Sequence, residues 1–504
     1  MERITQQNTT EKSVLIIGAG RTGLITARHL LTVPNCSITI VEAKSDIGGL
    51  WAYEELNEHH PKAEEAKRSD NYHRLYHCFQ GSIYPDVILN IPIQLVSCKD
   101  FTVKDFDPKL PDFLMLKQYN SYINAYCDHF GLRKYVTYNT LVKLVRPYEN
   151  LSAEEKSAIK DLPPRTWVVT TVDAKAESLS QNEKVATFDY VVAASGLNVK
   201  PHIPPVNGIS NFKGFVLHSK DFREPEDPIY RDKTILLLGG SYSGIDMVVQ
   251  FFHNPIKGRQ KIKKMIFCAK DVGIVENSID FKDLREEGVL EAKKGWVSDF
   301  TEDSVIFTDG TSEKVDVVMF CTGYMPACPY LDPGDKIIDF GGEGSRDKYI
   351  GPLYKRVVSI RQPRLLFAGT IDFTPIGHYL NEAQIIFIKH IIEGSVKLPT
   401  VEEMTNEHEK DIEAVKANSK DGSLANYFRL EILKTDLPYL ESLQRMCQHL
   451  YPGGEEKAKK YVDSLVAMTK TALDLFMNGN LLQYKSLDFS SMFPEEVRNT
   501  TEFY

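Results

Sequence analysis

The sequence predicts an α/β fold built from two similar strand–turn–helix units. Two stretches carry this prediction: KSVLIIGAGRTGL at 12–24 and KTILLLGGSYSGI at 233–245 align without gaps, so that Gly18 corresponds to Gly239. In each, an apolar run typical of a buried parallel strand leads into a glycine-rich turn and then into apolar residues at helical spacing. At 504 residues the chain also exceeds the size at which single cores stop growing, about 250–300 residues, so more than one domain is expected.

The first unit has the order of elements that a dinucleotide-binding motif requires. The apolar run 13–17 ends in the turn 18–23, a helical pattern follows, and a second apolar run at 37–41 ends at Glu42. Strand, glycine turn, helix, strand and acidic residue therefore follow one another within about 30 residues, as in a βαβ nucleotide-binding unit.

Each glycine of this first turn has a physical reason. Gly18 permits the tight turn, Gly20 lets the backbone approach a pyrophosphate, and Gly23 allows close packing of helix on strand. The helix N-terminus offers free N–H groups and a partial positive charge to the phosphates, and Glu42 can accept the ribose hydroxyls. The predicted binding residues of the first dinucleotide are Gly18, Ala19, Gly20, Arg21, Thr22, Gly23 and Glu42.

The second unit repeats the first and third glycines but has serine in the middle position. Serine is small, and its hydroxyl can donate to a phosphate oxygen, so we expect a phosphate site with slightly altered clearance. The nucleophile elbow of hydrolases, G-x-S-x-G, would need glycine at 243, where serine stands. The predicted binding residues of the second dinucleotide are Gly239, Ser241, Tyr242, Ser243 and Gly244.

The residues that follow the second strand of each unit distinguish the two sites. The first unit has Glu42 there, whereas the second, after the apolar run 264–268, has Lys270 beside Asp271. A carboxylate suits a free ribose 2′-hydroxyl and a basic side chain suits a 2′-phosphate, so the first site is predicted to bind FAD and the second NADPH. A plain surface lysine at 270 is the alternative, and because Asp271 lies beside it, the choice between NADPH and NADH stays open.

Two further strands, one before and one after the second unit, indicate how the domains are arranged. Buried strands at 190–196 and 315–324 each end in a small residue and glycine, and each follows a charged, turn-rich hairpin. Prolines at 201, 204 and 205 are typical of a linker. The sequence therefore predicts a NADPH domain inserted into a FAD domain, with boundaries at 1–205 (FAD, first part), 206–325 (NADPH) and 326–504 (FAD, second part, with a C-terminal helical extension).

Composition excludes several functional classes. With a net charge of −9 and a pI near 5.9, the chain has no general attraction for nucleic acid or anionic membranes. No apolar run reaches the ~18–20 residues of a membrane span, and the polar start, MERITQQNTTEKS, is no signal peptide. A cytoplasmic protein with reduced cysteines is therefore expected. His73 and His77 are spaced for a helical metal site, but no third ligand follows, so no metal is predicted.

A motif between the two units narrows the function. Residues 212–222, FKGFVLHSKDF, fit F-x-G-x-x-x-H-x-x-x-F through Phe212, Gly214, His218 and Phe222. This resembles the identifying motif of the flavin-containing monooxygenases, class B flavoproteins. Phe222 favours the flavin-containing monooxygenases proper, because the Baeyer–Villiger branch has tryptophan there and the N-hydroxylating branch proline.

Other segments resemble the same family in order and spacing. They are the G-G-L-W at 48–51, the segment 84–92 with Asn90 and Ile91, the C-T-G-Y at 321–324 and the E-A-Q at 382–384, and the resemblance runs from about 12 to 395. The Ser-Tyr-Ser at 241–243 matches many microbial members. The resemblance adds cofactor-binding candidates at Gly49, Leu50, Trp51, Asn90, Ile91, Val142 and Gln384 to those already named, Lys270 among them.

The resemblance implies a monooxygenase of the N,N-dimethylaniline type that consumes NADPH and O₂. In this family NADPH reduces FAD, O₂ forms a C4a-hydroperoxyflavin, and a soft nitrogen or sulfur of a small amine or sulfide attacks it, so the cofactor carries the hard chemistry. Asn90 is the implied catalytic residue, as a hydrogen-bond donor to the peroxide; a turn residue before Ile91 is the alternative. His218 is implied to order the interdomain linker rather than to act as a base. Phe373 or Tyr379 are candidates to line the substrate pocket, and a homodimer is expected.

Other functions remain to be weighed against this one. An NADPH oxidase that releases H₂O₂ and a Baeyer–Villiger oxygenase of ketones would use the same two cofactors. A disulfide reductase needs a close cysteine pair, and Cys321 and Cys328, the nearest candidates, follow the wrong strand. A sensor with inactive cofactor sites conflicts with the intact first turn, Glu42 and Trp51.

Overall fold

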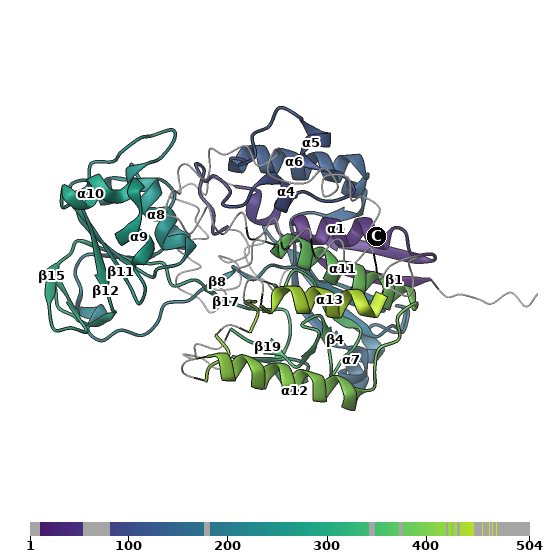
Figure 1. The fold of residues 1–504 in the computed structure, drawn as a ribbon. Helices are drawn as coiled ribbons and strands as arrows, with labels where there is room; N and C mark the ends of the chain where they lie inside the picture. The colour runs from purple at the N-terminus through teal and green to yellow at the C-terminus, as the bar shows by residue number, and fades with distance from the viewer. Residues whose placement is uncertain are drawn as a thin grey trace, which may run out of the picture.

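The computed structural model describes residues 11–53, 81–175, 182–341, 348–371, 376–419, 422–425, 427–430 and 434–447, together with single positions at 456, 463, 466 and 470. Within these ranges the predicted α/β fold is confirmed. Two parallel sheets with flanking helices form two lobes that are joined in the middle of the molecule (Figure 1).

The larger lobe is built on a seven-stranded sheet with the order β20-β21-β22-β7-β1-β2-β3. Its centre is parallel: β1 pairs with β2 on one side and β7 on the other, β22 extends the parallel part, and β20 and β21 add an antiparallel edge. The strands are β1 (Lys12–Ile17), β2 (Cys36–Val41), β3 (Val136–Thr137), β7 (Tyr190–Ala193), β20 (Leu353–Tyr354), β21 (Val358–Ser359) and β22 (Leu365–Phe367).

Helices and a second sheet cover this larger sheet. Helix α1 (Arg21–Leu30) packs against α11 (Gly377–Glu393) and shares one buried apolar cluster with α6 (Leu116–His129) and α13 (Asp436–Cys447). An antiparallel sheet of β4 (Thr140–Pro147), β5 (Trp167–Asp173) and β6 (Lys184–Phe188) shares a second buried cluster with β1 and β7. Shorter elements are α4 (Ile93–Val96), α5 (Val103–Phe106), α7 (Ala153–Ala158), β18 (Asp339–Phe340) and β19 (Ile350–Gly351).

The charged segment after Thr400 forms helix α12 (Val401–Asn418), as its spacing predicts. Thr400 and Glu403 form a capping box at its start, in which each side chain bonds the backbone N–H of the other residue. Met404 and His408 are its buried residues, Ile412 and Val415 are half-buried against an apolar cluster, and most of the remaining residues are exposed.

The smaller lobe is a five-stranded, entirely parallel sheet with the order β12-β11-β10-β16-β9. Helix α8 follows β10 across the second glycine turn, and α9, α10 and a three-stranded antiparallel sheet complete the lobe (Figure 1). The elements are β9 (Phe215–His218), β10 (Thr234–Leu238), α8 (Tyr242–Phe252), β11 (Lys264–Ala269), α9 (Gly273–Asn277), α10 (Lys282–Glu286), β12 (Leu290–Lys294), β13 (Val297–Phe300), β14 (Ser304–Phe307), β15 (Ser312–Lys314) and β16 (Val317–Phe320).

The chain passes between the two sheets through paired segments. It leaves the larger sheet after β7 and returns after β16, and the two crossings meet as the antiparallel pair β8 (Lys200–Pro201) and β17 (Tyr324–Met325). The amide of His202 also donates to Gly323 O at 2.9 Å. These contacts favour the predicted insertion; the exact boundaries at 205 and 325 stay a prediction.

Among the described residues, every helix is too short or too polar to cross a lipid bilayer.

Candidate active site

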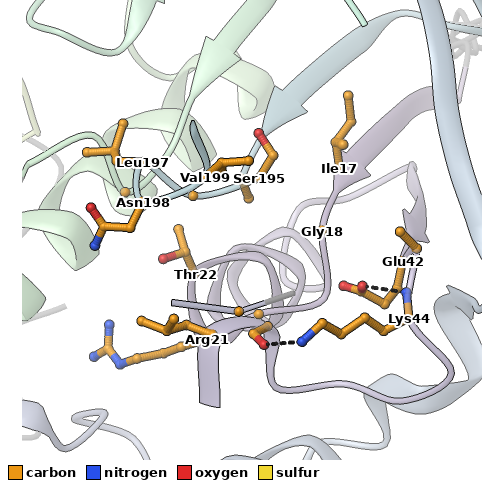
Figure 2. A pocket seen from close by; sticks show the side chains of 18 of the residues that line it. Ile17, Gly18, Arg21, Thr22, Glu42, Lys44, Ser195, Leu197, Asn198 and Val199 are labelled. Carbon is orange, nitrogen blue, oxygen red and sulfur yellow. Dashed lines mark hydrogen bonds between the residues drawn. The ribbon is translucent and has the colours of Figure 1, made fainter. Parts of the chain in front are cut away.

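A cavity of about 380 Å³ opens where β1 and β7 end at the same edge of the larger sheet. The first glycine turn, the N-terminus of α1 and the segment after β7 surround it (Figure 2). Ligands of open α/β sheets bind in this position, beyond the carboxyl ends of the strands. Nine predicted cofactor residues line it: Gly18, Gly20, Arg21, Thr22, Glu42, Gly49, Leu50, Trp51 and Val142.

The geometry of the turn explains its outer glycines. Gly18 has φ +103°, and a Cβ there would lie 2.8 Å from Ala194 O. A Cβ on Gly23 would lie 1.9 Å from Gly18 O, inside any possible contact distance. These two glycines therefore hold helix α1 tightly against the end of β1, so that its free N–H groups face the cavity.

The middle glycine, Gly20, meets a second glycine from the predicted G-G-L-W segment. Gly20 and Gly48 form an isolated bridge, and a Cβ on Gly49 would lie 2.8 Å from Gly20 Cα. Gly49 also has φ +57° and begins the 3-10 turn Gly49–Trp51. Lys44 Nζ secures this turn by donating to Gly49 O at 3.1 Å and to Ala52 O at 2.9 Å. The space in front of Gly20 is thus left open by two glycines from different parts of the sequence.

Glu42 is buried at the edge of the cavity and is already bonded to the backbone. Its Oε2 accepts from Ala19 N at 2.7 Å. Its Oε1 accepts from Lys44 N at 2.9 Å (Figure 2). A carboxylate has about four acceptor positions, so both oxygens retain capacity for a ribose hydroxyl. The glycine turn and the N-terminus of α1 fit the pyrophosphate of FAD, and the Glu42 carboxylate fits its ribose.

Arg21 brings a buried positive charge to the same wall. Its side chain is buried, and within the described part of the chain Nε and Nη2 have no hydrogen-bond partner. The pKa of its guanidinium is raised: burial alone would lower it, but neighbouring groups, Glu382 of α11 among them, outweigh burial. Burial raises the pKa of the Glu382 carboxyl, against the attraction of Lys99 and Arg21. A buried guanidinium with two nitrogens that lack acceptors, beside the glycine turn, fits an anionic cofactor group.

A second cavity of about 430 Å³ lies at the second glycine turn. Gly239 has φ +126°, and a Cβ on Gly244 would lie 2.1 Å from Gly239 O, so the outer glycines repeat the geometry of the first turn. Predicted residues lining this cavity are Gly239, Ser241, Tyr242 and Ser243, and the C-T-G-Y segment at 321–324 forms its opposite wall.

The two cavities meet at residues that sequence analysis did not single out. Leu197 and Asn198, directly after β7, line both of them. The second cavity is also lined by two basic residues distant in sequence, Lys348 and Arg429. The only sequence signal for Asn198 was its place after the strand-end glycine at 196.

Several predicted residues lie outside the linings of both cavities. Asn90 is half-buried in the loop before α4 and Ile91 follows it, and Lys270 is exposed just after β11. Gln384 lies one layer behind the wall, where its Oε1 accepts from Gly369 N at 3.1 Å. The Tyr379 hydroxyl donates to Gln94 O. The cofactor and catalytic roles of these residues stay predictions, and Phe373, His73 and His77 lie outside the described residues.

His218 is buried at the junction of the lobes. Its Nδ1 accepts from Lys220 N at 3.1 Å, so in the neutral ring Nε2 carries the proton and donates to Gly323 O at 3.0 Å. Burial lowers the pKa of His218 to about 4. At the other end of the motif, Phe222 packs edge-on against Tyr84 at 5.1 Å between ring centroids. This neutral, doubly bonded histidine fits a role in ordering the linker.

The described cysteines bear only on the disulfide-reductase alternative. Cys321 and Cys328 are both free and buried, and burial raises the pKa of each thiol to about 12. Over the described ranges, no cluster of three or more His, Cys, Asp or Glu side chains is arranged to hold a metal.

Comparisons with known proteins agree with this architecture. The flavin-binding monooxygenase-like family matches residues 11–260 and 285–448. Senecionine N-oxygenase of Tyria jacobaeae is 27% identical over 444 residues, which are 86% of this chain and 85% of that protein. Trimethylamine monooxygenase of Methylocella silvestris is 26% identical, over 93% of each chain. The structure of S-allyl-L-cysteine S-oxygenase from Allium sativum superposes with a TM-score of 0.71 at 22% identity, covering 98% of this chain and 99% of that one.

Proposed function

The chain belongs to the flavin-binding monooxygenase-like family, and from that premise we propose that it oxygenates a soft nitrogen or sulfur atom of a small molecule. It is an enzyme of the flavin-containing monooxygenase type, and its cofactors are FAD and NADPH, the pair that the sequence predicts. FAD occupies the first cavity and NADPH the second in this proposal.

The observation that carries the proposal is the meeting of the two cavities at Leu197 and Asn198. A hydride can pass between two cofactors only when their reactive rings touch, so adjoining sites are required. The segment that joins them follows β7 directly, and β7 lies beside β1 in the larger sheet. The end of β7 therefore places Asn198 where its amide can bond either cofactor.

When bound, the reduced flavin supplies the O₂ chemistry, and the protein supplies binding, orientation and exclusion of water. The first turn and Glu42 hold the pyrophosphate and ribose, and Lys44 fixes the backbone at Gly49. Trp51 closes one side, packed edge-on against Tyr119 at 4.7 Å between ring centroids. His218 fixes the segment that returns to the larger lobe, by its bond to Gly323 just after β16.

We keep Asn90 as the proposed hydrogen-bond donor to the reacting oxygen. The segment that carries it is anchored on the inserted lobe, because Tyr84 packs on Phe222 and Asn254 Nδ2 donates to Asp86 Oδ2 at 3.3 Å. An Asn90→Ala variant should still oxidise NADPH but should release H₂O₂ in place of product. Unchanged product yield would remove Asn90 from the mechanism.

The substrate class rests on the relatives. Their names specify N-oxygenation for senecionine and S-oxygenation for S-allyl-L-cysteine, and trimethylamine is an amine. Small amines and thioethers, with O₂ as co-substrate, are therefore the proposed partners. A cytoplasmic location and a homodimer stay predictions.

The test is a screen of amines and sulfides for substrate-stimulated NADPH consumption, with O₂, H₂O₂ and oxygenated product measured together. The proposal expects one N-oxide or sulfoxide per NADPH with at least one substrate. NADPH consumption matched throughout by H₂O₂ would identify an oxidase instead. Lactone or ester formation from ketones in a parallel panel, without amine or sulfide turnover, would identify Baeyer–Villiger chemistry.

A further inference from the structure

A third cavity, of about 510 Å³, lies apart from the first cofactor cavity, between the turn that joins β20 to β21 and helices α12 and α13. Only Arg429 lines both this cavity and that of the second glycine turn. Six charged side chains surround it: Lys355, Arg356, Glu407, Asp411, Arg429 and Lys434.

The charge of this cavity is opposite to that of the protein. Four of the six residues are basic and two are acidic, whereas the whole chain carries −9. Lys355 forms an ion pair with Glu407, which neutralises one charge of each sign. Arg429 and Lys434 also have interaction partners of their own, so the charge that the cavity offers to an anion is mainly that of Arg356, and a concave positive surface attracts anions.

Arg356 is the residue that most clearly lacks a partner. It is only 6% exposed, and among the described residues its Nε and Nη1 have no hydrogen-bond partner. Its guanidinium lies 5.2 Å from the ring centroid of Tyr427 and 5.5 Å from that of Tyr439. Ring faces stabilise a cation but do not satisfy its N–H groups, and a buried charge without hydrogen bonds is costly. An anion in the cavity would supply the missing acceptors.

The backbone at Arg356 is strained as well. Lys355 and Arg356 have φ +51° and +54°, a left-handed conformation that glycine adopts freely and other residues only at a cost. A glycine would therefore suit the turn better, yet the chain places an arginine there. Strain of this kind is typical of ligand-binding positions.

We propose that this cavity binds a small oxyanion, either free phosphate or the carboxylate of an organic acid, with its charge on the Arg356 guanidinium. Guanidinium groups suit both ligands because their N–H groups form charge-assisted hydrogen bonds with oxyanions. Lys434, exposed at the rim, adds a second positive charge.

A hydrogen-bond path connects this oxyanion cavity to the FAD cavity. The Tyr439 hydroxyl donates to Lys355 O at 2.8 Å and accepts from Gln384 Nε2 at 2.7 Å. Gln384 Oε1 in turn accepts from Gly369 N, and Gly369 lines the FAD cavity. An anion on Arg356 therefore acts on the same turn that positions Gln384, so its binding is expected to change the environment of the flavin.

Isothermal titration calorimetry of the FAD-loaded protein tests the site, with inorganic phosphate and citrate as separate probes at constant ionic strength. Saturating NADP⁺ is present, so that the second glycine turn is occupied. The variants are Arg356→Gly, which relieves the left-handed strain, Lys434→Ala at the exposed rim, and the control Arg361→Ala. Arg361 is an exposed neighbour that pairs with Asp339 outside the cavity.

At least one probe should bind the unaltered protein, and Arg356→Gly should weaken that binding about tenfold or more, the usual effect of losing a charge-assisted hydrogen bond. Lys434→Ala should weaken it several-fold, and Arg361→Ala should leave it unchanged. The probe that binds tells phosphate from carboxylate. No binding of either probe, or equal binding by Arg356→Gly and Arg361→Ala, overturns the proposal. If Arg356→Gly does not fold, the dissociation constants of Lys434→Ala and Arg361→Ala are compared instead. Equal values overturn the proposal.

Visible absorption of the flavin, followed in the same titration, tests the path through Gln384. A spectral shift that saturates with the calorimetric Kd supports it, and binding without any shift overturns it. Both readouts are independent of oxygenation, so they stand whichever substrate screen succeeds.

Discussion

The two glycine turns share their outer glycines but differ in the middle. In the first turn, a Cβ on Gly20 would make only an ordinary contact, 3.5 Å from Gly49 Cα, whereas a Cβ on Gly49 would lie 2.8 Å from Gly20 Cα, so the crowding falls on the glycine from the other segment. In the second turn, Ser241 opens α8 without such a neighbour, and the crowded position is instead Gly240, where a Cβ would lie 2.7 Å from Ala269 Cβ and 2.8 Å from Asp271 O. The second turn has therefore not lost a glycine; it has glycine at the position that its own neighbours crowd.

This difference shows which parts of the motif are general. The third glycine of each turn meets the backbone of its own unit, and the first meets the backbone after the neighbouring parallel strand, at Ala194 O or Cys321 O, so both units need them. The middle position depends on what the rest of the fold brings close, which differs between the lobes. The residue that follows the second strand of each unit also differs. Glu42 is buried and bonded to the first turn, whereas Lys270 is exposed and lies outside the second cavity.

The largest effects are expected from Gly23→Ala and Gly244→Ala, which place a Cβ about 2 Å from a backbone oxygen in either turn. Overpacking of this kind typically costs about 1–3 kcal/mol or more, which lowers ligand affinity roughly tenfold to 100-fold. Gly23→Ala should purify without FAD, measured by absorbance. Gly244→Ala should retain FAD and show a raised KM for NADPH.

Gly288→Ala is the matched control, since its φ is +73° but no atom lies within 4 Å of the added Cβ. It should cost only about 1–2 kcal/mol of stability from left-handed strain. Loss of FAD from Gly244→Ala as complete as that from Gly23→Ala would contradict separate cofactor sites.

Exchanging the residues at the strand ends should have the next largest effect. In Glu42→Gln an amide N–H faces either Ala19 N or Lys44 N, both of which are donors, at a cost of about 1–3 kcal/mol. We expect FAD to bind at least tenfold more weakly. Lys270→Ala should raise the KM for NADPH several-fold and leave that for NADH unchanged. Equal changes in the two KM values would remove its role at the 2′-phosphate.

The middle positions give a smaller contrast. Gly240→Ala should destabilise the protein by about 1–3 kcal/mol, because its Cβ meets both a side chain and a backbone oxygen, and should raise the KM for NADPH. Ser241→Gly should change both quantities by less than about half of that, because the serine side chain makes no hydrogen bond that caps α8. Thermal unfolding and steady-state kinetics measure both. A larger effect at 241 than at 240 would restore the idea of a lost glycine.

The last effect is expected only in acid and concerns the contact between His218 and Gly323. Burial lowers the pKa of His218 to about 4, against an ordinary value of 6.5. The folded state therefore favours the neutral ring, so this stability is fully present above pH 6.5 and is lost as the pH falls through 4. The unfolding free energy of the His218→Gln variant should fall less between pH 6.5 and 4 than that of the unaltered protein. Identical pH slopes would show that His218 does not titrate on unfolding.

Sequence predicted the parts of the site that are local. The turn at 18–23 and Glu42 belong to one βαβ unit, so their spacing alone defined them. The role of Gly49 could be predicted only from the family resemblance, because its partner Gly20 lies 29 residues earlier in the chain. Asn198 and Lys348 could not be predicted, since only the packing of the two lobes brings the end of β7 and the segment before β19 to the second turn.

Insertion of one sheet within another determines the order in which they can be completed on the ribosome. All five strands of the inserted sheet lie between 215 and 320. The larger sheet is complete only after β20, β21 and β22, at 353–367, have been synthesised. Because domains fold as units during synthesis, we expect the insert to become native first. Until β22 emerges, β7 remains an unpaired apolar edge, and such edges promote aggregation. Chaperone dependence should therefore be greatest while the insert is being translated.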